Sequence, residues 1–588
     1  MRTIEDIHQQ FAECFNDYVV KPYAYFLSKN LLEGNICIAI DEPLIRIAES
    51  PYKNVPGVEA LKKSSLVGID ADAVTPFILQ NNKLYLHRYY HYESIIVNRI
   101  KELVYSGNDL VTQRMEKLSQ QAAIIKNLNA TLPNNIHPDL KIDWQLAAAL
   151  QVLTQNFSII TGGPGTGKTT TLAKVLRILY AIEPNARIAL AAPTGKASMR
   201  MYESLNNTNI DLPNEIKTKF ESLKPSTIHS LLGYIYNSVN FKYNSKNTLP
   251  FDWIIVDEAS MIDVPMFAKL LQAMDQQARI ILLGDKDQLA SVEAGSLLGD
   301  LCLSVEKINQ FTAEKAEWIN QFITAEEHKI TPAFINTENK LLAGKITELK
   351  LSHRFNSEGG IGKLSKAILN NESTILQEYI ASPIDANVII DTAYSNEVLQ
   401  QFTEGYNDFI QEPNIKNAIK KLNNLRILVA VREGDRGLYA VNKKVENILQ
   451  QKKLINIDSE FYHNRPIIVT KNMYEFGLFN GDVGIIRNGR AYFELANQEE
   501  PKPFLPAYIT SAETVFAMTI HKSQGSEFTK VLIVLPEGTE NPLLTKELLY
   551  TGVTRAKNTV TIQASGATIL HAANATVKRT SGLRERLG

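Results

Sequence analysis

The chain has 588 residues, of which 44% are hydrophobic and 21% are charged, and its formal net charge is −1. This length exceeds the usual size of one domain, so three or four domains are expected. No stretch approaches the roughly 20 apolar residues that a membrane-spanning helix needs, and the charge balance excludes a generally basic protein that coats nucleic acid through bulk electrostatics.

The first residues and the cysteines indicate the cellular compartment and whether a metal site is expected. The opening sequence MRTIEDIHQQF has Glu5 and Asp6 among its apolar residues and lacks the hydrophobic region of a signal peptide, so we expect a cytoplasmic protein. Cys14, Cys37 and Cys302 are widely scattered without metal-ligand spacing. We interpret each cysteine as a small buried apolar residue and predict no zinc or iron–sulfur site.

Residues 1–115 are predicted to form a mostly helical N-terminal domain. Apolar residues recur at helical spacing between positions 4 and 15, two short strands flank Asn81-Asn82, and another helix follows over residues 95–104. The run RYYHY at 88–92 is either a surface that stacks on nucleic acid or a set of core aromatics, and the second interpretation is favoured. Residues 116–140 become polar and end in LPNNIHPDL, which predicts a linker.

A phosphate-binding loop follows in SIITGGPGTGKTTT, residues 158–171. Apolar residues finish a buried strand, glycines let successive backbone N–H groups converge on phosphate oxygens, and a helix then presents its positive N-terminal end to the same anion. An ordinary glycine-rich turn is the alternative, and the strand before and helix after the loop disfavour it. The nucleotide-binding residues predicted here are Gly162, Gly163, Pro164, Gly165, Thr166, Gly167, Lys168, Thr169 and Thr170. Lys168 supplies charge to the β/γ-phosphates, and Thr169 offers a hydroxyl to Mg²⁺.

Strands and helices alternate from Asp143 onward, as in a parallel sheet covered by helices. Strands are predicted at 187–192, 253–256 and 279–283, and the polar residues after them face the ligand edge of the sheet. Asp257 is predicted to hold Mg²⁺ through water and Glu258 to orient and deprotonate the attacking water. Gln288 offers a neutral amide to the γ-phosphate.

A second alternating region contains strands predicted at 426–431, 530–535 and 559–562. It has no phosphate loop of its own, so it is not an independent ATPase. Within it, short strands and the turns Asn480-Gly481 and Asn488-Gly489 predict a small β-barrel insertion at about 475–512.

Two sheets that share one nucleotide site are the layout of superfamily 1 helicases, and the motif series resembles that superfamily in order and wording. The motifs are GGPGTGKTT, APTGKAS at 192–198, STIHSLLG at 226–233, VDEAS at 256–260, GDKDQLASVEAGS at 284–296, LSHRF at 351–355, TIHKSQGSEF at 519–528 and LLYTGVTRAK at 548–557. The wording is most similar to the 5′→3′ branch and, within it, to the RecD family. The resemblance covers residues 141 to 588, and LYLHRYYHYE extends it into the N-terminal domain.

The resemblance implies an α/β fold with two RecA-like P-loop motor lobes, at 141–345 and 346–588, and an SH3-like form for the β-barrel insertion. It implies ATP and Mg²⁺ as cofactors, with Gln145 reading the adenine and with Thr169 and Asp257 at the metal. Lys168, Glu258 and Gln288 would be catalytic, joined by Arg354 and Arg555 as arginine fingers from the second lobe. A surface salt bridge is the alternative for either arginine.

The resemblance also implies a single-strand DNA track that carries no sequence information. Its residues would be Pro193, Thr194, Thr227, His229, Thr519, His521 and Lys522. A projecting hairpin near 235–250, in which Val239, Phe241 and Tyr243 alternate, is predicted to split the duplex; a loop packed on its own lobe is the alternative.

The implied partners are single-stranded and duplex-end DNA and RecB-like and RecC-like subunits in a heterotrimer, which the N-terminal domain would contact. The expected role is a 5′→3′ motor of a helicase–nuclease in double-strand-break repair, with the nuclease on another subunit. The 5′→3′ polarity follows from the resemblance alone. A stand-alone 5′→3′ helicase and an ATPase module that regulates a partner nuclease through its nucleotide state stay open as alternatives.

Overall fold

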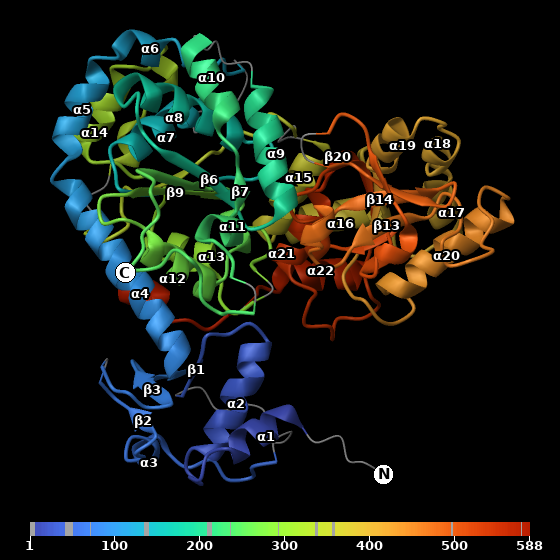
Figure 1. Cartoon of the computed structure of the whole chain (residues 1–588), viewed down its shortest axis with the longest axis horizontal. Helices are drawn as coiled ribbons and strands as arrows, with labels where there is room; N and C mark the ends of the chain where they lie inside the picture. Colours follow the sequence, from blue (N-terminus) through green and yellow to red (C-terminus); the bar gives the residue numbers. More distant parts are fainter. Residues whose placement is uncertain are drawn as a thin grey trace.

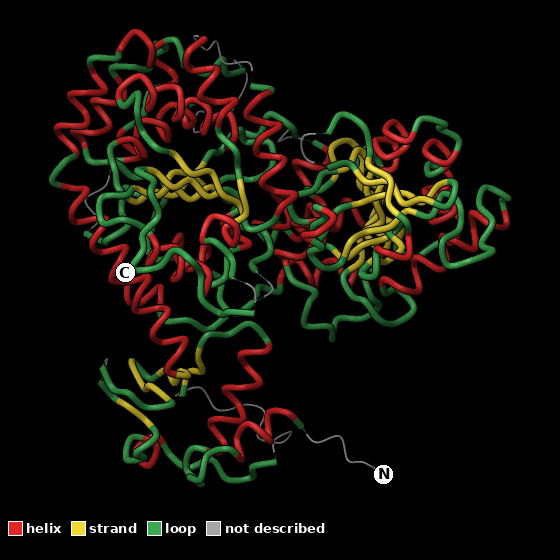
Figure 2. Tube along the Cα trace, viewed as in Figure 1, coloured by secondary structure: helices red, strands yellow, loops and turns green. Residues whose placement is uncertain are grey.

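The described parts of the chain are organised by two parallel and two smaller sheets, with helices packed around them (Figures 1 and 2). The computed structural model describes residues 6–40, 51–70, 72–133, 140–208, 214–235, 237–291, 293–335, 339–355, 359–495, 498–577 and 579–588. No helix in these ranges is both long and apolar enough to cross a membrane.

Lobe 1 is built on a six-stranded parallel sheet in the order β10-β5-β9-β8-β6-β7. Its strands are β5 Phe157–Thr161, β6 Ile188–Ala192, β7 Ser226–Thr227, β8 Trp253–Val256, β9 Arg279–Gly284 and β10 Ile346–Glu348. Alternate strand residues are buried on opposite faces: Ile160 packs in the core that includes α7 and α8, and Ile159 in the core that includes α4 and α12. The predicted strands at 187–192, 253–256 and 279–283 are confirmed.

Helices cover both faces of this sheet. They are α7 Trp144–Leu153, α8 Lys168–Ile182, α9 Gly195–Asn206, α10 Asn214–Ser222, α11 Ile228–Leu232, α12 Val264–Ala273, α13 Leu297–Cys302 and α14 Ala313–Asn320, with the 3₁₀ turns Ala259–Met261, Glu326–His328 and Pro332–Phe334.

Two boundaries of lobe 1 differ from the prediction. β10 pairs with β5, so this lobe extends past the predicted limit of residue 345. In the predicted linker 116–140, the chain forms the end of α5 Val111–Ser119 and all of α6 Ala122–Lys126, whose Leu118 and Ile125 lie in the lobe 1 core. Isolated apolar residues in a polar stretch therefore anchor these helices to the lobe, and the stretch is not a free linker; residues 134–139 lie outside the described residues.

Lobe 2 contains a five-stranded parallel sheet in the order β11-β20-β19-β12-β18. Its strands are β11 Val388–Asp391, β12 Leu425–Val429, β18 Ala517–Thr519, β19 Phe528–Val534 and β20 Ala556–Gln563, which confirms the three predicted strands and adds two. The surrounding helices are α15 Gly360–Leu369, α16 Ser373–Ala381, α17 Asn396–Glu404, α18 Asn407–Ile410, α19 Ile415–Leu422, α20 Leu438–Gln451, α21 Lys546–Val553 and α22 Gly566–Asn574.

The insertion in lobe 2 is a five-stranded antiparallel sheet in the order β16-β15-β14-β13-β17. Its strands are β13 Pro466–Val469, β14 Val483–Arg487, β15 Arg490–Phe493, β16 Lys502–Phe504 and β17 Ala512–Thr514, with 3₁₀ turns at Tyr474–Phe476 and Pro506–Tyr508. The sheet therefore begins before the predicted position 475. Among the described residues β16 and β17 are not paired with each other, so a closed SH3-like barrel stays a prediction.

The N-terminal domain combines helices with a four-stranded sheet, of which the prediction of a mostly helical domain included only the hairpin around Asn81-Asn82. Its elements are α1 Ile7–Glu13, α2 Lys21–Leu32, β1 Cys37–Ala39, α3 Val58–Leu61, β2 Val67–Gly68, β3 Phe77–Gln80, β4 Lys83–Leu86 and α4 His87–Asn108, with sheet order β1-β4-β3-β2. β1 and β2 are too short to show an alternating pattern. The β3–β4 hairpin was predicted, and Asn81 and Asn82 take the positive φ angles, 47° and 57°, that its turn requires.

The long helix α4 runs from the N-terminal sheet to lobe 1, where it packs against α12 (Figure 1). Tyr90 of the RYYHY run is buried and Arg88 Nε donates to the Tyr92 hydroxyl, so the run packs at least partly as core aromatics. The predicted burial of cysteines holds for Cys37 and Cys302, whereas Cys14 is exposed.

The C-terminal helix α23, Leu583–Leu587, returns to the junction between these two parts of the molecule. Leu583 and Leu587 are buried in the same core as α4, and the Ile36 N–H donates to the Thr580 carbonyl. The chain end that leaves lobe 2 thus holds the N-terminal domain against lobe 1.

Candidate active site between the two lobes

The phosphate loop connects the end of β5 to α8, which begins at Lys168. Gly165 and Gly167 have φ angles of 78° and 87°, which side-chain-bearing residues rarely adopt. A Cβ on Gly167 would lie 2.2 Å from Gln145 Nε2, so this glycine also permits the close approach of the predicted adenine-reading residue. The sequence therefore folds here as a tight anion-binding turn at a helix N-terminus.

Lys168 lies folded over this loop. Its Nζ donates to the carbonyls of Gly162, at 2.6 Å, and Gly163, at 3.2 Å, while the Thr166 hydroxyl donates to Gly163 at 2.8 Å. Backbone carbonyls thus hold the ammonium group at the centre of the loop, where it can reach a phosphate group.

A cleft of about 560 Å³ lies over the loop and brings residues of both lobes together. The predicted site residues that line it are Gln145, Pro164, Gly165, Thr166, Gly167, Lys168, Thr169, Thr170, Asp257, Glu258, Gln288, Arg354 and Arg555. Gly162 and Gly163 lie at its base as the acceptors of Lys168. The structure therefore gathers the predicted ATP-site residues in one place.

Two acidic residues follow β8 at the edge of the cleft. Burial and the neighbouring Glu258 raise the pKa of Asp257 to about 6. The Glu258 N–H donates to Asp257 Oδ1 at 2.8 Å, and Glu258 has a positive φ of 52°, where the chain leaves the strand. A buried carboxylate with a raised pKa gains from a cation beside it.

These residues fit a Mg²⁺ ion bound together with a nucleotide. Among the described residues no group of three or more His, Cys, Asp or Glu side chains is arranged to hold a metal alone. A Mg²⁺ ion at a phosphate loop does not need such a group, because phosphates and water supply most of its ligands. Thr169 and Asp257 line the same cleft and offer the hydroxyl and the carboxylate that remain.

A buried contact joins the lobes behind the cleft. Arg555, 3% exposed, donates through Nη2 to Gln288 Oε1 at 2.8 Å, and through Nη1 and Nε to the carbonyls of Ser526 and Thr551. Gln288 in turn donates to Asp285 Oδ2 at 2.9 Å. The predicted arginine finger of lobe 2 thus touches the predicted glutamine of lobe 1.

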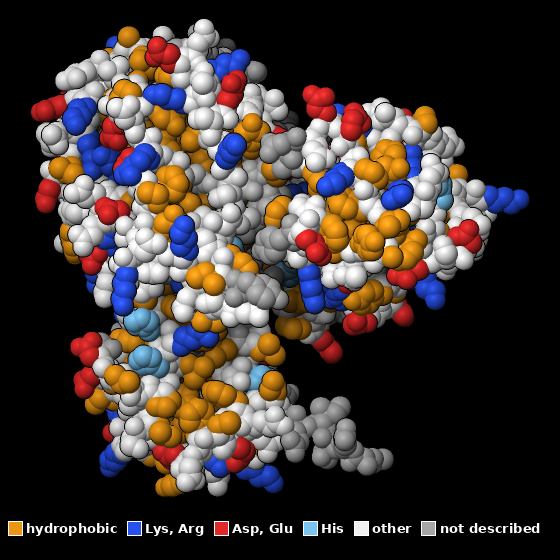
Figure 3. Space-filling view, viewed as in Figure 1, with side chains coloured by type: hydrophobic (Ala, Val, Ile, Leu, Met, Phe, Trp, Pro, Cys, Tyr) orange, Lys and Arg blue, Asp and Glu red, His pale blue; other side chains and the backbone are white. Residues whose placement is uncertain are grey.

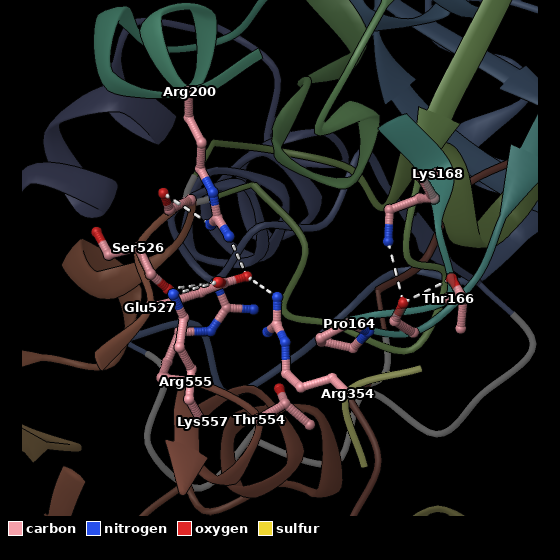
Figure 4. A network of polar contacts seen from close by, with 12 residues as sticks. Pro164, Thr166, Lys168, Arg200, Arg354, Ser526, Glu527, Thr554, Arg555 and Lys557 are labelled. Carbon is pink, nitrogen blue, oxygen red and sulfur yellow. Dashed lines mark hydrogen bonds and ion pairs between the residues drawn. The ribbon is translucent and has the colours of Figure 1, made fainter. Parts of the chain in front are cut away.

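Arg354 belongs to a second network, which Figure 4 shows and which sequence reasoning missed. The Oε1 atom of Glu527 accepts from Nη2 of Arg354 at 2.5 Å and also pairs with Nη2 of Arg200 on α9. Lys557 Nζ lies 3.4 Å from Glu527 Oε2. Glu527 and Arg200 line the nucleotide cleft. The SQGSEF motif contains Glu527, but nothing in the sequence shows which cations it meets.

Lys174 of α8 also lines the cleft and was not predicted. It is 5% exposed, and its Nζ has no hydrogen-bond partner among the described residues. Burial lowers the pKa of this lysine. A buried ammonium without an acceptor is unfavourable, so its position calls for a ligand atom or carries a cost in stability.

Two further clefts contain most of the predicted DNA track. A cleft of about 410 Å³ is lined by Pro193, Thr194, His229, His521 and Lys522, and a neighbouring one of about 850 Å³ by Thr227 and His229. Both clefts have walls from lobe 1 and lobe 2. Thr519 lines neither: it is 8% exposed at the end of β18, and its hydroxyl accepts from the Lys522 N–H at 3.3 Å. Thr519 therefore contacts the backbone of the loop that contains Lys522, and it is not among the residues that line the two clefts.

The predicted projecting hairpin near 235–250 is not formed by paired strands. The segment has single bridges between Tyr234 and Phe241 and between Asn244 and Asn247, and Phe241 and Tyr243 pack on the lobe 1 core. The Phe241 ring meets the His229 ring edge-on at 5.8 Å. The packing of Phe241 and Tyr243 favours the alternative of a loop packed on its own lobe, whereas Val239 is 72% exposed, so the wedge stays a prediction. Residue 236 lies outside the described residues.

Comparison with known proteins agrees with this geometry. A family model described as an AAA domain matches residues 145–294, and one described as a UvrD-like helicase C-terminal domain matches residues 514–562. The two matches lie on opposite sides of the nucleotide cleft. Fold and site together define an ATP-dependent DNA helicase.

The more specific relationship comes from proteins similar along most of the chain. RecBCD enzyme subunit RecD of Haemophilus influenzae is 36% identical over 87% of this chain and 81% of its own. RecBCD enzyme subunit RecD of Mycolicibacterium smegmatis is 35% identical over 75% of this chain and 74% of its own. A structure of Bacteroides sp Pif1 with ADP-AlF4 has 17% identity and a TM-score of 0.33, covering 72% of this chain and 92% of that one. The chain belongs to the RecD family.

Proposed function

We propose that this chain is the 5′→3′ DNA motor subunit of a RecBCD-type helicase–nuclease that acts in double-strand-break repair. One observation carries the motor part of the proposal: the phosphate loop of lobe 1 and Arg555 of lobe 2 line the same cleft, and Arg555 contacts Gln288 across it. The polarity and the type of complex rest on the membership of the RecD family. A nucleotide bound there touches both lobes, so its binding and hydrolysis change how the lobes meet.

The roles proposed for the site residues are supported by their positions in the cleft. Lys168 neutralises charge on the β/γ-phosphates, and Thr169 and Asp257 hold the Mg²⁺ that accompanies ATP. Glu258 takes the proton of the attacking water. Gln288 contacts the γ-phosphate and also contacts lobe 2 through Arg555. Arg354 and Arg555 stabilise the charge that develops on the transferred phosphoryl oxygens, which suits the fork geometry of arginine. Gln145, whose Nε2 lies 3.3 Å from the Thr166 carbonyl, reads the adenine.

DNA binding is assigned to the two clefts shared by the lobes. Hydroxyl, imidazole and ammonium groups from Thr194, Thr227, His229, His521 and Lys522 contact the phosphate backbone of a single strand without reading its sequence. Relative movement of the lobes changes the distance between the two sets of contacts, which is how hydrolysis would advance the strand. Acidic and basic side chains are mixed over the face in Figure 3, which supports local DNA contacts over a basic coat.

The proposed partners are RecB-like and RecC-like subunits, in the cytoplasm, with the nuclease on another subunit. The N-terminal domain is the proposed contact, and its exposed apolar side chains support this. Among the described residues they include Ile7, Tyr18, Leu32 and Val74, which are 71%, 81%, 78% and 93% exposed.

Lys168→Gln tests the proposal. The variant keeps most of the side-chain stem and removes the charge, so DNA-stimulated ATP hydrolysis and unwinding should fall together by roughly 10²–10⁴-fold. Lys217→Gln, on the exposed face of α10, is the matched control and should hydrolyse ATP like the wild type. A folded Lys168→Gln protein with near wild-type hydrolysis on single-stranded DNA would refute the motor assignment.

Tailed duplexes separate the remaining alternatives. Preferential unwinding from a 5′ single-stranded tail is expected, and preference for a 3′ tail would refute the polarity. An ATPase module that regulates a partner nuclease would hydrolyse ATP on DNA and unwind neither duplex, with or without the partner subunits. A stand-alone helicase would unwind fully without them and would not co-purify with them.

A further inference from the structure

The Glu527 carboxylate lies between cations from three parts of the chain (Figure 4). Arg200 comes from α9 of lobe 1, Arg354 from the segment that follows β10, and Lys557 from β20 of lobe 2. The Glu527 side chain is 11% exposed. Burial disfavours its charge, but Arg200 and Arg354 outweigh burial and lower the pKa of Glu527 to about 2. Glu527 is therefore an anion at neutral pH.

This anion belongs to the nucleotide cleft. Glu527, Arg200 and Arg354 all line the cleft that also contains Lys168 and Asp257. A phosphate group that enters the cleft carries negative charge and presents oxygen atoms, as the carboxylate does. Glu527 and the nucleotide therefore offer the same kind of acceptor to the same arginines.

Arg354 is paired on one side only. Its Nη2 donates to Glu527, whereas its Nη1 is buried and has no hydrogen-bond partner among the described residues. A guanidinium group has five N–H donors and favours two-point contacts with an oxyanion. The one-sided contact with Glu527 leaves Arg354 able to gain hydrogen bonds when it moves to a phosphate.

We propose that Glu527 is a positioning residue that holds Arg200 and Arg354 in the nucleotide-free cleft and competes with the terminal phosphate of ATP for them. This inference rests on the proposed function in one respect, namely that Arg354 acts on the nucleotide. Exchanging one anion for another avoids exposing a desolvated guanidinium without a partner.

The exchange makes the arginines sensitive to the γ-phosphate. ADP lacks this group, so it competes with Glu527 poorly and leaves the arginines on the carboxylate. ATP draws them away and also breaks the Arg200–Glu527 contact, which joins lobe 1 to lobe 2. The Arg555–Gln288 contact involves neither oxygen of Glu527. ATP therefore replaces one contact between the lobes, Arg200–Glu527, and leaves the other, Arg555–Gln288, in place.

Glu527→Gln tests the competition in the full chain. Glutamine keeps the shape of the side chain and lacks the charge, so the arginines are held more weakly. Titration with fluorescent ATP and ADP analogues should show ATP binding tightened by about tenfold, the factor that corresponds to about 1.4 kcal/mol, and ADP binding changed by less than about twofold. DNA-independent hydrolysis should rise, because Arg354 is free before DNA binds.

Glu537→Gln is the matched control. Glu537 is a 77% exposed glutamate of lobe 2 that pairs with Arg436 at 3.3 Å, away from the residues that line the cleft. This variant loses the same charge from the same lobe and should leave both affinities unchanged. Thermal unfolding of both variants reports whether they are folded.

A double-variant cycle makes the test independent of small changes in stability. In an Arg354→Gln background the Glu527→Gln change should tighten ATP binding by clearly less than it does in the wild type. The reason is that one of the two arginines held by the carboxylate, Arg354, is already absent. Equal weakening of ATP and ADP by Glu527→Gln, or an unchanged ratio of the two affinities, would overturn the proposal. Failure of the motor assignment is separate: the wild type would then not hydrolyse ATP on single-stranded DNA, whereas the affinity ratio can still be measured.

Discussion

Glu93→Gln should stabilise the protein at high pH and leave its stability unchanged at low pH. Glu93 of α4 is fully buried where the C-terminal segment packs, and it accepts the Gly582 N–H at 3.0 Å. Arg586 Nη1 lies 3.7 Å from the other carboxylate oxygen. Gly582 fits only as a glycine, because a Cβ there would lie 2.2 Å from the Tyr85 hydroxyl.

The size of the effect follows from the pKa of Glu93. Burial raises this pKa from the ordinary 4.5 to about 7, against the opposing influence of the Gly582 N–H and Arg586. Between these pH values the folded protein keeps a proton that the unfolded chain loses, so stability falls as the pH rises through this range. Above pH 7 the full cost of the buried charge is present, at most about 3 kcal/mol.

Glutamine keeps an acceptor for Gly582 and cannot ionise. The difference in melting temperature between Glu93→Gln and wild type should therefore be near zero at pH 4.5, grow between pH 4.5 and 7, and level off above pH 7. Differential scanning calorimetry across this range measures it, and Glu585→Gln, an exposed carboxylate on α23 that pairs with Lys83, is the matched control. A Glu93→Gln protein that is less stable than wild type at pH 8 would show that the Arg586 pair outweighs burial and would refute this reasoning.

Three further variants test other contacts. Arg555→Lys keeps the charge but loses the fork that contacts Gln288 and the carbonyls of Ser526 and Thr551, so kcat on single-stranded DNA should fall by roughly 10²–10³-fold and the melting temperature should fall as well; a rate within threefold of wild type would contradict the finger assignment. Lys174→Met removes a buried ammonium that has no hydrogen-bond partner in the described part of the chain and should stabilise the protein without nucleotide by about 1–3 kcal/mol in thermal unfolding, whereas a lower melting temperature would indicate an unrecognised acceptor. Phe241→Ala with Tyr243→Ala removes packing on lobe 1, so ATP hydrolysis and unwinding should fall together; loss of unwinding alone would support the wedge hypothesis.

Local patterns allowed much of the motor core to be predicted. The glycines and Lys168 lie within one loop whose geometry follows from neighbouring residues, and short apolar runs such as 279–283, each ending where polar residues begin, favour buried strands. Features that depend on distant pairing were missed. β10 has three residues and becomes a strand only by pairing with β5. β2 of the N-terminal sheet has two residues and is likewise a strand only through its pairing with β3.

The polar network of the cleft shows the same limit. Arg354 and Glu527 are 173 positions apart in the sequence, and only the arrangement of the lobes brings them together. Motif wording identified Arg354 as a candidate finger, since the residues around it belong to one short segment. It did not identify the carboxylate that holds this arginine, because any of the 63 acidic residues of the chain satisfies the charge requirement.

The contacts between the lobes also indicate where the motion of the motor begins. The Leu289 N–H donates to the Thr551 hydroxyl, and the Tyr550 hydroxyl donates to Asp285. These contacts tie α21 to the end of β9 through residues that do not line the nucleotide cleft. Arg200 and Arg354, in contrast, are held by a carboxylate in the cleft itself. If ATP replaces only the second set, the first set acts as the fixed side of a hinge, and the lobes rotate about α21 as the arginines change partner. Lobe 2 then moves most on the side away from α21. The distance between the DNA contacts of lobe 1 and those of lobe 2 must therefore depend on whether ATP or ADP occupies the cleft.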